Sequence, residues 1–148
     1  MPNLSFFRAF NAVYGKVGRA ASEECILALL QAKCLPILLY GTEACPLLSR
    51  DRQSFGFTVN RLFMKIVRTG SPCVVKECQQ NVNFLPIESQ LEIRTATFLQ
   101  AFSATKNTLS LLFKHCAVTQ LSSIFSKYKP NVIRSASQLA RIMRYNLS

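Results

Sequence analysis

The feature that most constrains the fold is a long apolar stretch from Cys25 to Tyr40. Gln31, Lys33 and Pro36 interrupt it, whereas a membrane-spanning helix needs about 20 consecutive residues that are nearly all apolar. We therefore expect no membrane span. The stretch is apolar nearly all round a helix, which is typical of a helix surrounded by other elements of the fold.

Both ends of this stretch carry helix signals. Ser22 offers a hydroxyl cap, and Glu23 and Glu24 follow in the first turn, where the helix dipole favours acids. Pro36 lacks an amide hydrogen and clashes with the carbonyl four residues back, so the helix must kink or restart there. Gly41 ends the stretch. These signals predict a kinked hydrophobic helix at the centre of the fold.

The rest of the chain is also typical of helices joined by short turns, because its few glycines and prolines lie between segments of helical periodicity. We expect helices over residues 4–14, 49–70, 71–80, 86–106, 109–127 and 135–145. The first should end in a loop at Gly15 and Gly18, and the second should stop at Gly70. The second helix carries the clearest apolar stripe: Phe55, Val59, Leu62, Phe63, Ile66 and Val67.

The predicted fold class is therefore all-α. The chain has 148 residues, of which 49% are apolar, and a chain of this size buries roughly 68 to 70% of its unfolded surface. We expect a small helical bundle over residues 1–106. Residues 107–148 are Ser-rich, and we expect them to form a basic helical tail, loosely packed and in part disordered.

The N-terminal sequence MPNLSFFRAF lacks the pattern of a secretory signal, so we expect an intracellular protein, nuclear or cytoplasmic and not secreted. Its 6 cysteines would then be reduced, and mostly small core residues. The spacings of Cys73 and Cys78, and of His115 and Cys116, do not fit a structural zinc site or a catalytic Cys–His pair. We therefore expect no metal, no cofactor, no catalytic residue and no small-molecule substrate.

Positive charge is unevenly distributed. The formal net charge is +11, and from residue 96 onward there are 7 Lys and Arg but no Asp or Glu. A basic surface of this kind attracts polyanions, of which nucleic acid is the commonest inside cells. A tail whose charges are only solvated is the alternative.

The most defined basic face is expected on helix 49–70. Arg61, Lys65 and Arg68 are spaced at i, i+4 and i+7, away from the apolar stripe, where they would contact phosphates. A solvated helix face is the alternative. A second, less ordered group of predicted nucleic-acid-binding residues comprises Lys127, Lys129, Arg134, Arg141 and Arg144. Tyr40 and Phe84 are expected in the core, because base stacking needs aromatic rings exposed beside the basic face.

Four segments carry a family resemblance: FFRAFNAVYGKVGRAASEE, LLQAKCLPILLYGTEACPL, FTVNRLFMKIVRTGS and NFLPIESQLEIR. In this order they resemble the region downstream of the polymerase active site in non-LTR (LINE-type) retrotransposon reverse transcriptases, over roughly residues 5–102. The most specific part is the Cys-Pro-Leu-Tyr-Gly pattern of KCLPILLYGTEAC, preceded by the run from Asn11 to Arg19. The resemblance implies a helical thumb and connector, which grips the template–primer duplex behind the catalytic palm.

The resemblance implies RNA or an RNA–DNA hybrid as the partner, and a clamp rather than an enzyme. The palm's Tyr-x-Asp-Asp motif does not occur, and the segment from Tyr40 to Glu43 does not replace it. Two-metal nucleotidyl transfer needs several carboxylates, and Asp51 is the only aspartate. The alternatives are a basic helical protein-interaction module, a cationic protein on anionic membranes, or a non-functional translated remnant of a mobile element.

Overall fold

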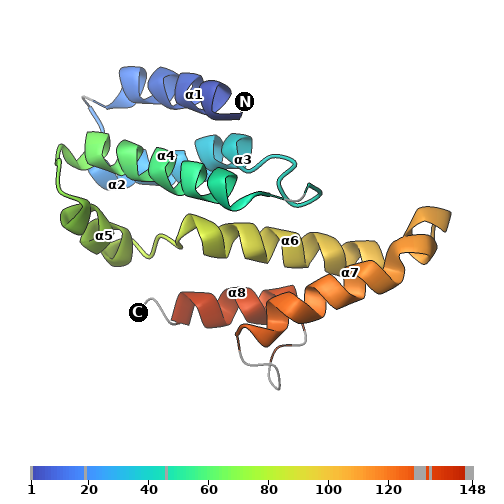
Figure 1. Cartoon of the computed structure of the whole chain (residues 1–148). Helices are drawn as coiled ribbons and strands as arrows, with labels where there is room; N and C mark the ends of the chain where they lie inside the picture. Colours follow the sequence, from blue (N-terminus) through green and yellow to red (C-terminus); the bar gives the residue numbers. More distant parts are fainter. Residues whose placement is uncertain (1, 19, 46, 129–132, 134, 146–148) are drawn as a thin grey trace. The chain divides into compact units, whose positions relative to one another are not determined.

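The computed structural model describes residues 2–18, 20–45, 47–128, 133 and 135–145, with side chains from residue 5 onward. Regular structure over these ranges is helical, without a strand among them, which confirms the predicted all-α class (Figure 1). The chain divides into two compact units. The first comprises Met1–Gly41 and Leu47–Ile87, and the second Thr42–Pro46 and Glu88–Ser148. The domain boundary expected between residues 106 and 107 falls inside the second unit.

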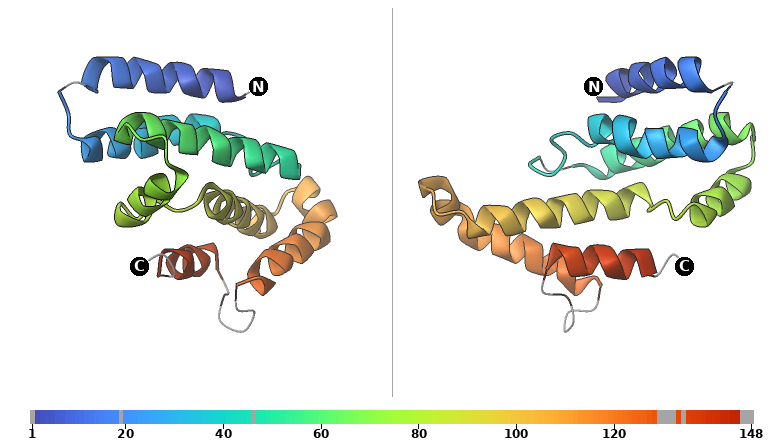
Figure 2. Two further views of the ribbon diagram at one scale, coloured as in Figure 1. Left: turned by 60° about the vertical axis from the view of Figure 1, so that its left-hand side comes forward. Right: turned by 180° about the vertical axis from the view of Figure 1, so that it is seen from behind.

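The first unit is a small bundle, and Figures 1 and 2 show its helices lying side by side. Helix α1 packs on the segment formed by α2, η1 and α3, whereas α4 packs on α2 and α5. The bounds of these elements are α1 Pro2–Val17, α2 Glu23–Leu29, η1 Leu30–Cys34, α3 Leu35–Leu38, α4 Ser49–Val67 and α5 Pro72–Asn81. The core between them includes Phe6, Phe10, Leu30, Leu38, Leu62, Phe63 and Phe84, each 2% exposed or less.

Helix α1 is longer than its sequence indicated. A loop was expected from Gly15, but the helix continues through this residue to Val17. A glycine inside a helix costs only about 1 kcal/mol relative to alanine, which the packing of α1 offsets. The helix ends at Gly18, whose amide donates to the Tyr14 carbonyl oxygen at 2.8 Å. A Cβ atom at Gly18 would lie 2.5 Å from that oxygen, so this end of α1 requires glycine.

The predicted interruption at Pro36 is confirmed, and it consists of a π-helical turn followed by a new α-helix. Helix α2 begins as expected, with the Cys25 amide donating to Ser22 Oγ at 3.4 Å. It continues into η1, a π-helical turn in which the Leu35 amide donates to the Leu30 carbonyl. Pro36 then lies in the first turn of α3, where a missing amide hydrogen is tolerated. Gly41, with φ +74, follows in the left-handed conformation that glycine favours.

The central segment is not surrounded on all sides. Its buried residues share one face, whereas Gln31, Ala32, Lys33 and Pro36 are exposed. The expectation of a helix enclosed all round was therefore wrong, because the π-helical turn rotates the residues after it and brings the apolar positions onto one side.

The second unit contains α6 (Ile87–Ala104), whose first residue, Ile87, is counted with the first unit. It also contains α7 (Thr108–Ser126) and α8 (Ala136–Tyr145). Asn107 and Ser110 form a reciprocal capping box at the start of α7. The Ala136 amide at the start of α8 donates to Gln100 Oε1 on α6 at 2.9 Å. Glu43, outside these helices, pairs with Arg94 of α6 at 3.4 Å. Helix α7 nevertheless leaves several large apolar side chains exposed: Leu109, Leu111, Leu112, Phe113 and Val118.

Candidate nucleic-acid interface

The predicted basic face lies on α4, in the first unit. The apolar stripe of this helix is buried as expected, except for the half-buried Val67. Arg61 and Lys65 are exposed on another side. Because residues four apart are neighbours on an α-helix, the two cations lie together. Within the described part of the chain neither forms an ion pair, so both charges can meet a bound anion.

Lys65 reaches across to α1. Its Nζ donates to Asn11 Oδ1 at 3.1 Å. The same nitrogen lies 5.6 Å from the centroid of the Phe10 ring and 5.2 Å from that of Tyr14, and these two rings stack on each other. Cation–π contacts at exposed sites contribute about 0.5 to 1 kcal/mol each. The ammonium group is therefore held in place against α1 while it stays exposed.

A hollow of about 300 Å³ lies between the two helices and is lined by Phe7, Asn11, Arg61, Leu62 and Lys65. Helix α1 contributes the side-chain amide of Asn11 and the ring of Phe7, and α4 contributes both cations. Guanidinium, ammonium and amide nitrogens are all hydrogen-bond donors. The hollow thus combines donors and positive charge, which suits a phosphate group.

Sequence reasoning missed Phe57 at this face. Cζ of Arg61 lies 5.8 Å from the centroid of its ring. The Phe57 side chain is 64% exposed, although it is large and apolar. Its spacing of four residues from Arg61 was the signal that could have placed it on the basic side of the helix.

Arg68 does not join this pair in the hollow. It is the residue at which α4 ends, and its backbone is left-handed, with φ 54 and ψ 40. The Thr69 amide donates to the Met64 carbonyl oxygen at 3.0 Å and closes the helix end. Helix α4 thus ends at the left-handed Arg68, two residues before the stop expected at Gly70. Arg68 is exposed and stands beside the negative end of the helix dipole.

The basic residues predicted in the second unit have separate surroundings. Lys127 Nζ lies 2.8 Å from Glu92 Oε1, so a carboxylate already partners its charge. Arg141 and Arg144 are exposed on α8, three residues apart. Lys129 and Arg134 lie outside the described residues. The three described residues thus differ in their surroundings: Lys127 is paired with a carboxylate, whereas Arg141 and Arg144 are exposed on α8.

The two aromatic residues expected in the core differ in their surroundings. Phe84 is 2% exposed and meets the Phe63 ring edge-on at a centroid distance of 4.8 Å, which confirms the expectation for it. Tyr40 is 84% exposed, and the expectation for it was wrong. Tyr40 follows the end of α3, so helical periodicity no longer determines where its ring lies.

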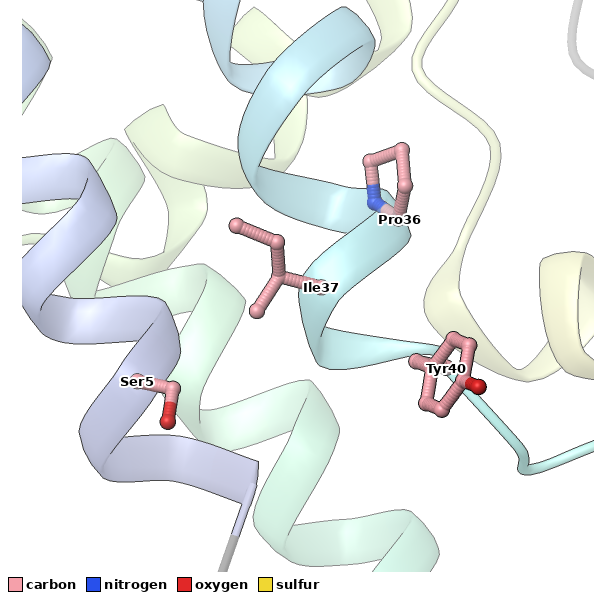
Figure 3. A pocket seen from close by; sticks show the side chains of 4 residues that line it. All are labelled: Ser5, Pro36, Ile37 and Tyr40. Atoms are coloured by element: carbon pink, nitrogen blue, oxygen red, sulfur yellow. The ribbon is translucent and has the colours of Figure 1, made fainter.

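Tyr40 lines a second hollow of about 510 Å³, together with Ser5, Pro36 and Ile37 (Figure 3). Figure 3 shows Ser5 on α1 and the other three residues on α3 or just after it. Its lining is mainly apolar. Among the described residues that line it, none is charged, so these residues offer no positive charge to an anion.

The described residues also bear on two other kinds of chemistry, metal binding and thiol reactivity. Within the described ranges, no group of three or more His, Cys, Asp or Glu could hold a metal ion. Burial raises the pKa of the Cys34 thiol, and burial, followed by the charge of Glu23, raises the pKa of Cys78. Both thiols therefore resist forming the reactive thiolate. Among the described helices, none is both long and apolar enough to cross a bilayer.

Comparisons with models of protein families, with curated proteins and with solved structures give no match for this chain. The chemistry of its own residues is therefore the guide to what the chain does. The best-defined site among them is the basic face of α4 with the adjoining hollow against α1.

Proposed function

We propose that this chain binds RNA or an RNA–DNA hybrid through the phosphate backbone. In this proposal it is a thumb-like fragment of a LINE-type reverse transcriptase that clamps template and primer but lacks the catalytic palm. The observation that carries the proposal is the exposed pair Arg61 and Lys65, which flanks the hollow between α4 and α1.

The geometry of this pair suits a row of phosphates. At about 1.5 Å of rise per residue, Arg61 and Lys65 lie roughly 6 Å apart along α4. An ammonium group has three donors, so the bond from Lys65 to Asn11 leaves others for a ligand. Because both side chains are exposed, a phosphate reaches them with little loss of hydration. Each contact also releases counterions, which strengthens binding at low salt.

The test replaces Arg61, Lys65 and Arg68 together with glutamine and measures binding to an RNA–DNA hybrid at several salt concentrations. Each lost phosphate contact lowers the slope of log K against log salt by roughly one, so we expect weaker binding and a slope lower by about two to three. Melting should change little, because the contacts that are lost, those of Lys65 with α1 and of Arg61 with Phe57, are made by exposed cationic side chains. The sequence of the hybrid should matter little, since phosphate contacts do not read bases.

A matched control removes the same amount of charge elsewhere in the first unit. Lys33, Arg50 and Lys76 are exposed, and none lines the hollow. Their replacement by glutamine should leave the slope within about one of the parent value. If the two triple variants bind alike, the face is only solvated and the proposal fails. Binding to anionic vesicles in place of the hybrid would instead indicate a membrane-surface protein.

One observation favours a second candidate, a helical protein-interaction module. Helix α7 exposes Leu109, Leu111, Leu112 and Phe113, which are between 50% and 72% exposed. A partner bound through this helix would be retained after nuclease treatment. Such binding should be lost in the double variant Leu112→Lys and Phe113→Lys and kept in the glutamine variant of α4.

A further inference from the structure

Phe57 is the residue of the α4 face that phosphate contacts alone do not explain. It precedes Arg61 by four residues and Lys65 by eight, so it shares their side of the helix. Its side chain is 64% exposed, whereas Phe55 and Phe63 in the apolar stripe are 4% and 0% exposed. The ring therefore lies at the basic surface and not in the core.

The surroundings of this ring distinguish it from an ordinary exposed apolar residue. The Arg61 guanidinium lies against it, with Cζ 5.8 Å from the ring centroid. The exposed fraction shows that much of the ring stays open to solvent beside this contact. Proteins bind unpaired bases with the same combination: a base stacks on an aromatic ring, and neighbouring basic side chains contact the backbone.

We infer that Phe57 is a stacking platform for an unpaired base, so that the α4 face prefers nucleic acid with a single-stranded segment. This inference rests on the proposed function and narrows its substrate class. Arg61 and Lys65 lie roughly 6 and 12 Å from Phe57 along the helix axis, where they would meet phosphates beside the stacked base. Bases inside a duplex already stack on one another, so a duplex interior offers this face only its phosphates.

The first experiment uses fluorescence. The chain contains no tryptophan, so Phe57→Trp places a single indole at the platform. Because the side chain at this position is largely exposed, the substitution should leave the melting temperature unchanged. At low salt the variant is saturated with a single-stranded RNA, with an abasic sugar–phosphate strand of equal length, or with a blunt RNA–DNA hybrid. We expect the RNA strand to quench the indole strongly, and the other two to leave its emission nearly unchanged.

The second experiment measures affinity with Phe57→Ala. Stacking on one aromatic ring changes affinity by about fivefold to 140-fold. We expect a loss of this size for single-stranded RNA, with an unchanged salt slope, and nearly unchanged affinity for the abasic strand. Leu48→Ala is the matched control, since Leu48 is 70% exposed and directly precedes α4. It should alter none of these affinities.

The outcomes separate this inference from the proposed function. If Phe57→Ala binds single-stranded RNA as tightly as the parent, while the glutamine variant of α4 loses affinity, the platform is wrong and the phosphate clamp stands. Equal quenching by the RNA and the abasic strand also overturns the platform alone. If the parent chain binds none of the three ligands in a salt-dependent manner, both the platform and the clamp are wrong.

Discussion

Glu92 illustrates at the residue scale how one buried carboxylate organises its neighbours. Glu92 is 8% exposed, and its carboxylate oxygens accept hydrogen bonds from Lys127 Nζ at 2.8 Å and from the Tyr128 hydroxyl. A buried charge is tolerated only when it is paired in this way. Lys127 was predicted to contact phosphate, and a phosphate would have to compete with Glu92 for it. The contact joins α6 to the end of α7.

The Tyr128 hydroxyl gives this cluster a pH dependence. Burial first, and then the bond to Glu92 and the charges of Glu92 and Glu88, raise the pKa of Tyr128 from 10.0 to about 12. The folded state therefore holds the phenol proton more tightly than the unfolded state does. The resulting stabilisation is complete below pH 10.0 and is lost as the pH rises towards about 12.

We therefore expect the free energy of unfolding of the parent chain to fall more steeply over this alkaline range than that of Tyr128→Phe. Urea titrations at a series of pH values measure the difference in unfolding free energy between the two chains. Both chains contain the same lysines, so the contributions of lysine titration cancel in this difference. Parallel pH profiles for the two chains would contradict the assignment.

At the element scale, α3 offers a sharp contrast between adjacent residues. Leu38 is fully buried at 0% exposed, whereas Ile37 is 39% exposed and lines the hollow beside Ser5. Leu38→Ala should cost about 2 to 5 kcal/mol of unfolding free energy, since it leaves a cavity in the core. Ile37→Ala, as the control, should cost less than about 1 kcal/mol. Chemical denaturation measures both, and equal costs would show that α3 does not pack as described.

The sequence predicted these elements where local chemistry decides the outcome. The Ser22 cap, the break at Pro36 and the buried stripe of α4 follow from hydrogen-bonding groups and spacing within a few residues. The extension of α1 through Gly15 could not be predicted in this way, because tertiary packing decides it. Arg68 as the left-handed residue was missed because Gly70 is the intrinsically better candidate for that conformation.

The candidate site was predicted in part, for a similar reason. The spacing of Arg61 and Lys65 places two cations side by side on any helix. Their neighbours Asn11 and Phe7 come from another helix, and no pattern within α4 could reveal them. Phe57 was overlooked because a large apolar residue is assigned to the core by default, although its spacing places it with the cations.

At the scale of the whole molecule, the chain has cations in excess and few carboxylates. The formal net charge is +11, and Asp51 is the only aspartate. Across the parts that the structure describes, no cluster of acidic, His or Cys side chains is suited to a metal ion. Binding of a polyanion is compatible with this balance, whereas metal-dependent nucleotidyl transfer requires convergent carboxylates.

We accordingly expect no extension product when the purified chain is supplied with primer, template, nucleotides and Mg²⁺. A polymerase that contains its catalytic palm, assayed beside it, controls for the substrates. Synthesis that depends on this chain and on Mg²⁺ would contradict the proposal that it is a clamp without a catalytic centre.

The π-helical turn η1 amounts to a one-residue insertion in an otherwise regular helix. A turn closed by an i to i+5 bond uses one residue more than an α-helical turn, so it sets the residues after it back by roughly 100°. Leu30 before the turn and Leu35 and Leu38 after it are thereby brought to the same buried side. In an uninterrupted α-helix these residues would drift round the axis. Pro36 lies just after this turn, but it is the extra residue of the turn that keeps the apolar side chains before and after it on one side of the helix.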